Sequence, residues 1–105
     1  GLKSHDDYEL SNKILSGSGN MVSFVVDGGD ELGRKMLNKM TVASQAISLG
    51  GVESLISMPY ATTHASWTQE ARIAAGIDLG FVRFSTGLED FDDLKNDFEQ
   101  ALSSL

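Results

Sequence analysis

The chain has 105 residues, which suits one domain, and its 41% hydrophobic and 22% charged composition is typical of a globular protein. The 15 acidic and 8 basic side chains give a net charge of −7, which argues against binding to nucleic acid or to anionic membrane surfaces. The sequence has no cysteine, no apolar run of the roughly 18 residues that a membrane span needs, and no signal or transit peptide at its start, so we expect a cytoplasmic protein.

The first half of the chain predicts two helices with a strand between them. A short helix is expected over residues 6–15, where acidic residues precede an apolar row. Residues 21–27 are β-branched and aromatic and lie between glycines, which predicts a buried strand. The next helix is expected over residues 30–40, with Asp30 as its N-cap. Its apolar residues recur every four positions: Leu32, Met36 and Met40.

The middle of the chain is less regular. Residues 41–59 hold two short apolar runs around a pair of glycines, which predicts two short strands. A helix is expected over residues 69–76, and the glycine at its end suits the position after a helix. Two residues compete for its N-cap: Ser66, which would form a capping box with Gln69, and Thr68.

The last third predicts a strand and a long helix. Residues 81–85 alternate between the two faces of a sheet. One face carries Val82 and Phe84, and the other carries Phe81, Arg83 and Ser85. A helix is expected from residue 89 or 90 to the C-terminus, with acidic residues in its first turn. Its apolar stripe consists of Phe91, Leu94, Phe98, Leu102 and Leu105.

The predicted order is helix, strand, helix, two strands, helix, strand, helix. Because hairpin-like and crossover connections are mixed, we expect an α+β fold, with a small, mostly antiparallel sheet and helices packed on one face. A single domain is expected to span residues 1–105, since the sequence shows no internal repeat and no low-complexity segment.

Most of the polar residues have a structural explanation. The only histidines, His5 and His64, lie far apart in a chain without cysteine, so no metal site is expected. We expect His5 to cap a helix or lie on the surface, and His64 to hold loop backbone. Ser48 and Ser54 lack the G-x-S-x-G context of a nucleophile and are expected to bond loop backbone.

Arg83 is different, because it faces away from Val82 and Phe84 and so away from the predicted core. A guanidinium can bind a carboxylate through two parallel hydrogen bonds, which makes Arg83 a candidate substrate-binding residue. From the residues alone, an ordinary intramolecular ion pair is the competing interpretation, since the chain has many acidic partners.

Several motifs occur together in this chain. They are GLKSH (1–5), GNMVSF (19–24), SLGGVESL (48–55), TTHAS (62–66), an E-x-R-x-x-x-G-I helix end (70–77) and VRFSTGLED (82–90). In order and spacing they resemble the C-terminal domain of the Cys/Met metabolism enzymes that depend on pyridoxal phosphate (PLP). That family includes cystathionine γ-synthase, cystathionine β- and γ-lyases and methionine γ-lyase. The resemblance covers essentially the whole chain.

The resemblance implies the small C-terminal domain of a fold-type-I enzyme, with an antiparallel sheet and helices on one side. It implies a PLP-dependent elimination or replacement on sulfur amino acids such as cystathionine, methionine or homocysteine, in a full-length protein that works as a homotetramer. The large N-terminal domain that binds PLP in the family is absent from these 105 residues.

The resemblance also implies roles for individual residues. Arg83 matches the arginine that binds the substrate α-carboxylate. Ser48 matches a serine near the cofactor lysine and the carboxylate, and Leu49 matches the adjacent position, which lends its backbone N–H. Thr63 matches a threonine near the carboxylate, in a segment where Thr62 replaces the family's methionine.

Two further features bear on activity. Ile47 occupies a specificity position that is often Glu in family members that handle a distal amino group, and its apolar side chain favours lyase chemistry on less polar substrates. The lysine that forms the Schiff base is missing, since no lysine here lies in an S-x-T-K context. The lysines are Lys3, Lys13, Lys35, Lys39 and Lys95. We therefore assign no catalytic residue and expect the isolated chain to be inactive.

Two hypotheses follow. The first is the substrate-carboxylate domain of a PLP-dependent lyase or synthase, with β- and γ-elimination both open. The second is a stand-alone, non-catalytic module that binds amino acids or mediates oligomerisation. The chain opens on Gly1 and not on methionine, which fits a tag remnant or a piece of a longer protein.

Overall fold

The computed structural model describes residues 1–105 and contains four α-helices, four strands and one short 3₁₀-helix. In chain order they are α1 (Tyr8–Ile14), β1 (Met21–Val25), α2 (Gly29–Lys39), β2 (Ser44–Gln45), β3 (Leu55–Ser57), the 3₁₀-helix η1 (Pro59–Ala61), α3 (Gln69–Ala74), β4 (Phe81–Ser85) and α4 (Phe91–Ser103). This order is the one predicted from the sequence, and η1 is the only additional element. No helix is both long enough and apolar enough to cross a membrane.

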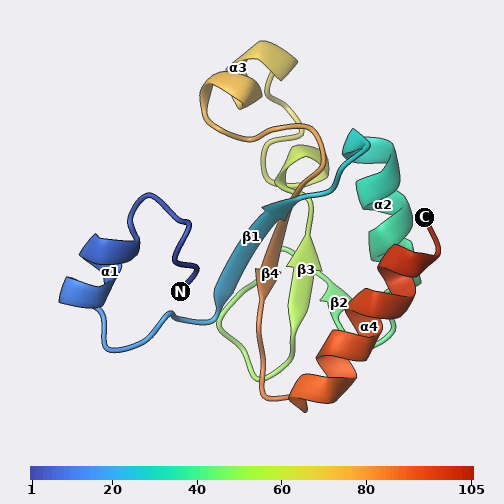
Figure 1. Cartoon of the computed structure of the whole chain (residues 1–105). Helices are drawn as coiled ribbons and strands as arrows, with labels where there is room; N and C mark the ends of the chain where they lie inside the picture. Colours follow the sequence, from blue (N-terminus) through green and yellow to red (C-terminus); the bar gives the residue numbers. More distant parts are fainter.

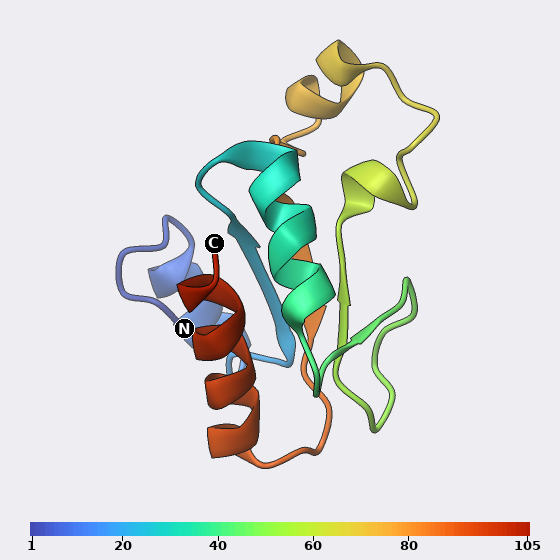
Figure 2. The same ribbon diagram turned by 90° about the vertical axis from the view of Figure 1, so that its right-hand side faces the viewer.

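The four strands form one sheet in the order β1-β4-β3-β2. β4 pairs antiparallel with β1 and β3, whereas β2 and β3 are parallel, so the predicted α+β fold with a mostly antiparallel sheet is confirmed. α2 and α4 lie together on one face of this sheet in both views (Figures 1 and 2). α1 and α3 lie apart from them (Figure 1), so the prediction that the helices pack on one face holds for only two of the four helices.

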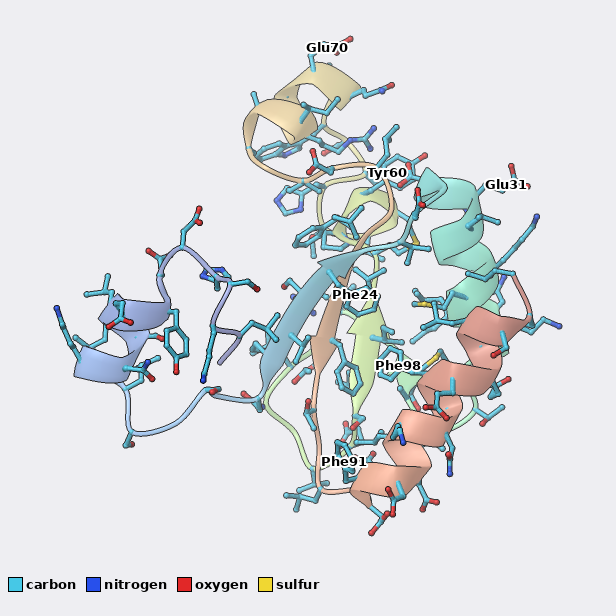
Figure 3. All side chains as sticks on the ribbon, viewed as in Figure 1. Phe24, Glu31, Tyr60, Glu70, Phe91 and Phe98 are labelled. Atoms are coloured by element: carbon cyan, nitrogen blue, oxygen red, sulfur yellow. The ribbon has the colours of Figure 1, made fainter.

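The core fills the space between the sheet and the two helices. The ring of Phe98 on α4 meets the rings of Phe84 and Phe24 edge to face, with centroids 5.0 and 5.9 Å apart. Figure 3 shows Phe24 and Phe98 between β1 and α4. The buried cluster consists of Val26, Met36, Leu37, Ala43, Ile56, Met58, Val82, Phe84, Leu94 and Ala101. We call the opposite face of the sheet, which carries the side chains of Phe81, Arg83 and Ser85, the open face.

Two burial predictions are wrong. β1 is a strand but not a buried one, because it lies at the edge of the sheet, where Met21 and Val25 on the open face and Val22 on the core face are all exposed. Val26, just after it, is buried. On α4, Phe91 is 75% exposed, and Leu102 and Leu105 are exposed as well. The buried residues of this helix are Leu94, Asp97 and Ala101.

The structure decides between the two predicted N-caps of α3 and shows that the predicted N-cap of α2 is wrong. Thr68, and not Ser66, caps α3, because its Oγ1 accepts a hydrogen bond from the Ala71 N–H at 3.2 Å. Asp30 lies inside α2 and makes no cap bond. Its carboxylate instead accepts the N–H of Gly80 at 2.7 Å, which ties the start of β4 to this helix.

Asp97 is the one buried carboxylate of the core and was not predicted. It accepts the backbone N–H groups of Thr41, Val42 and Ala43 at 2.7, 2.9 and 3.0 Å, together with the Thr41 hydroxyl at 2.9 Å. Burial raises the pKa of Asp97, but the hydrogen bonds from Ala43, Thr41 and Val42 lower it by more, so its pKa lies below the ordinary value. The ionised carboxylate therefore fastens α4 to the link between α2 and β2.

We expect Asp97→Asn to lower the free energy of unfolding by about 2–3 kcal/mol, because the amide cannot accept all of these bonds. Asp93→Asn, on the exposed side of the same helix, is the control. Since the folded pKa of Asp97 is depressed, its contribution is present above the unfolded pKa and is lost as the pH falls through the folded value, below about pH 4. Urea unfolding at several pH values measures both effects, and equal losses in the two variants would contradict this role.

Candidate functional site

Arg83 lies in the middle of the sheet on the open face. β4 is an inner strand, so Arg83 has a partner on each neighbouring strand: Ser23 on β1 and Ser57 on β3. Paired residues point to the same face, so two serines flank the arginine. Val82 and Phe84, on either side of Arg83, are buried and face the core. The Arg83 side chain therefore faces away from α2 and α4, and it is half-buried. The predicted facing of this strand is therefore confirmed.

The Arg83 guanidinium is held by backbone and not by a carboxylate. Its Nη2 donates to the carbonyl oxygens of Ile47 and Ser48, at 2.5 and 3.2 Å. Its Nε is buried and has no partner. The salt bridges of the chain join other residues, Lys35 with Glu31 and Lys95 with Glu99, so an intramolecular ion pair of Arg83 is contradicted. Its charge is left without a counter-ion.

The carbonyls that hold Arg83 belong to residues 47–54, which join β2 to β3 and which we call the crossing loop. Residues 47–53 are all exposed, yet the loop is fastened at several points. Gly50 has a φ of +74°, in the left-handed region that favours glycine, and its N–H donates to Ser85 Oγ at 3.0 Å. The loop therefore crosses the open face to reach two side chains of β4.

The far end of the crossing loop is fastened to the turn between β4 and α4. Leu88 donates its N–H to the Val52 carbonyl at 2.8 Å. The Glu89 carboxylate accepts the N–H and the hydroxyl of Ser54, both at 2.7 Å, and Ser54 Oγ accepts the N–H of Gly87 at 2.9 Å. These bonds from the Ser54 N–H and then its hydroxyl lower the pKa of Glu89. Ser54 thus satisfies loop backbone, as predicted.

The backbone N–H groups of Ile47, Ser48 and Leu49 donate no hydrogen bond within the chain. Because these residues are exposed, their donors are open to a ligand. They lie next to the carbonyls that the guanidinium contacts. The structure therefore brings together one uncompensated positive charge and unpaired N–H donors, a combination suited to an anion such as a carboxylate.

The other predicted residues have different surroundings. The Ser48 hydroxyl makes no hydrogen bond, so the expected bond from it to loop backbone is wrong. Thr63 is exposed after η1, and its hydroxyl bonds His64 Nδ1 at 2.8 Å and not the Arg83 group. The His64 ring meets the Trp67 ring edge to face, with centroids 4.7 Å apart, and holds no backbone. His5 lies on the surface, as expected, and its Nδ1 accepts the Asp7 N–H at 3.1 Å just before α1. No group of three potential metal ligands lies together.

Sequence reasoning missed Ser85 as a contact of the site. The signal was present, because the alternation of β4 places Ser85 on the same face as Arg83, two residues further along. A serine in a strand carries no chemical signature by itself. Its role depends on the crossing loop coming back over β4, which the order of residues does not show.

The chain is similar to known enzymes over its whole length. The model of the family described as Cys/Met metabolism PLP-dependent enzyme matches residues 1–103. An L-methionine gamma-lyase of Treponema denticola is 45% identical over 105 residues, which cover all of this chain and 26% of that protein. An L-methionine gamma-lyase of Fusobacterium nucleatum subsp. nucleatum is 43% identical, with 100% and 27% covered.

A solved structure is similar as well. It is a cystathionine gamma synthase from Xanthomonas oryzae pv. oryzae in complex with aminoacrylate and cysteine, with a TM-score of 0.90 and 43% identity. The match covers 98% of this chain and 27% of that one. The chain therefore spans about a quarter of the length of the relatives that it matches.

Gly87 tests how tightly the crossing loop is fastened. A Cβ added there would lie 2.4 Å from the Val52 carbonyl oxygen and 2.5 Å from the Ser54 nitrogen, both backbone atoms. We expect Gly87→Ala to destabilise the chain by about 1–3 kcal/mol, since the backbone has to move apart. Gly17→Ala is the control, because nothing lies within 4 Å of its Cβ position. Urea unfolding compares the two variants, and equal stability would mean that the loop is loosely held.

Proposed function

Because the chain belongs to the Cys/Met metabolism PLP-dependent enzyme family, we propose that it is the C-terminal domain of a cytoplasmic enzyme that acts on sulfur amino acids. In this proposal it carries the site for the substrate α-carboxylate. Its length, about a quarter of that of its relatives, supports a division of labour with a larger part of the protein. The motifs at 1–5, 48–55 and 82–90 support the C-terminal placement.

The observation that carries the proposal is the uncompensated guanidinium of Arg83 beside unpaired N–H groups. Nη2 is occupied by the two loop carbonyls, so Nη1 is free to donate to a carboxylate oxygen. The Leu49 N–H is free to donate to the second oxygen. Charge-assisted bonds of this kind are about twice as strong as neutral ones and fix the orientation of a carboxylate. Ser48 contributes through its backbone, because its carbonyl accepts from Nη2 and its own N–H has no partner within the chain.

Thr63 and Ile47 have more peripheral roles in the proposal. Thr63 is exposed on the turn after η1 with its hydroxyl bonded to His64, so its role near the carboxylate rests on its match to the threonine of the family motif. Ile47 is 58% exposed, and its carbonyl lies directly against the guanidinium. An apolar side chain at this place gives no partner to a distal ammonium group on a substrate, which favours lyase chemistry on amino acids with less polar side chains.

Members of the family depend on PLP, but the lysines of this chain do not fit the role of holding it. All five are exposed. Lys3 and Lys13 lie in the N-terminal arm, and the other three lie on α2 and α4, which cover the face of the sheet opposite to Arg83. Stabilisation of negative charge at the substrate Cα, which the cofactor supplies, therefore has to come from another part of the protein. We infer that the chain alone is inactive.

The open face of the sheet has the apolar character that contact with a separate cofactor-binding domain requires. Several apolar side chains on or beside it are exposed: Met21, Val25, Ile47, Leu49 and Val52. Apolar surface of this kind marks an interaction site in a folded protein. We propose that the N-terminal PLP domain of the full-length protein packs here and closes the site, and that four such chains form the working enzyme.

Arg83→Lys in the full-length enzyme tests the proposal. A lysine keeps the charge but loses the fork of donors, so we expect KM for the amino-acid substrate to rise about tenfold to a hundredfold, with little change in PLP content. The matched control is Arg34→Lys on the exposed side of α2. Steady-state kinetics and cofactor absorbance give the two readouts. An unchanged KM, or equal losses of substrate affinity and PLP content, would remove Arg83 from the carboxylate site.

A further inference from the structure

We propose that Ser85 is a positioning residue for the carboxylate site, although it touches no substrate. Its hydroxyl holds the Gly50 N–H and thereby fixes the backbone of Ser48 and Leu49 opposite Arg83. This inference rests on the proposed function, because it assigns Ser85 a task only if Arg83 and the loop donors bind a carboxylate.

The geometry places the crossing loop between two neighbouring side chains of one strand. Arg83 and Ser85 both point to the open face, since they are two residues apart on β4. Arg83 donates to the carbonyls of Ile47 and Ser48, and Ser85 accepts from the N–H of Gly50. The two contacts flank Leu49. Its N–H is the donor that the proposed function assigns to the carboxylate, and its direction follows from the two flanking contacts.

The contact is needed because residues 49–51, between the two fastened ends of the loop, have no other hydrogen bond to hold them. Between the Ser48 carbonyl and the Val52 carbonyl, the bond to Ser85 is the only hydrogen bond that fastens the backbone. It falls on a glycine with a φ of +74°, the residue type with the greatest freedom to move. Without the Ser85 hydroxyl, residues 49–51 would be free to sample other conformations.

Burial argues for a positioning role and against a purely structural one. Ser85 is 1% exposed, and a buried hydroxyl must find a partner. The partner is not another strand but a loop whose residues 47–53 are all exposed and add nothing to the core. Fixing residues 48–50 buries no core side chain, so it contributes less to folding than the attachment of Val52 and Ser54 at the far end of the loop. It does matter for a ligand that has to find two donors in a fixed arrangement.

Ser85→Ala in the full-length enzyme tests this inference. We expect the inhibition constant of L-norleucine, an amino acid without a sulfur leaving group, to rise about fivefold to tenfold, as expected for one lost hydrogen bond. L-norleucinamide, which has no carboxylate, is expected to lose less than about twofold. Hydrogen exchange at the Gly50 amide is expected to speed up, while the amides of β3 and β4 keep their protection.

Three comparisons make the result decisive. Thr68→Ala is the matched control, since the Thr68 hydroxyl also accepts one backbone N–H, that of Ala71 in α3, but makes no bond to the crossing loop. Equal weakening by Thr68→Ala and Ser85→Ala, or equal weakening by Ser85→Ala towards both ligands, would overturn the positioning role. If Ser85→Ala does not fold, Ser85→Cys, with a similar size and a weak acceptor, replaces it. If Arg83→Lys leaves L-norleucine binding unchanged, the proposed function itself fails; if only Ser85→Ala has no effect, the inference about Ser85 fails alone.

Discussion

The candidate site depends on the way the backbone of residues 47–54 is fastened across β4 and the turn that follows it. Arg83 donates to backbone carbonyls at the beginning of this loop, and the Ser85 hydroxyl accepts a backbone N–H in its middle. At its end, the Glu89 carboxylate accepts hydrogen bonds from Ser54. None of these contacts involves the hydrophobic core. The sheet supplies the rigid element, and the loop supplies the donors that a rigid strand, with its N–H groups already paired, has no means to offer.

This arrangement gives a physical meaning to the two motifs that carry the family resemblance. In SLGGVESL, Gly50 allows the left-handed turn, and Ser54 donates hydrogen bonds to the Glu89 carboxylate. In VRFSTGLED, Arg83 and Ser85 face the loop, while Gly87 leaves room for the Val52 carbonyl. The two motifs are far apart in sequence and form one unit in space. Asp97 does a similar task on the other face of the sheet, where it binds three N–H groups between α2 and β2.

Much of the fold could be predicted from local patterns. The order of elements, the facing of Arg83 and the short strands on either side of the glycine pair all follow from alternation and from turn residues. What could not be predicted depends on tertiary neighbours. β1 has the composition of a buried strand, but its place at the edge of the sheet leaves it exposed. Asp97 is buried because backbone donors from a distant segment surround it. The partners of Arg83 are backbone carbonyls, which a pattern of side chains does not predict.

The central claim is that this chain provides the carboxylate site and that another part of the protein provides the cofactor. A crystal structure of the full-length protein with bound L-norleucine tests it most directly. The account predicts one carboxylate oxygen within about 3 Å of the Arg83 guanidinium and the other within the same distance of the Leu49 N–H, with PLP attached to a lysine outside these 105 residues. A carboxylate bound elsewhere, with Arg83 still bonded only to the carbonyls of Ile47 and Ser48, would contradict it.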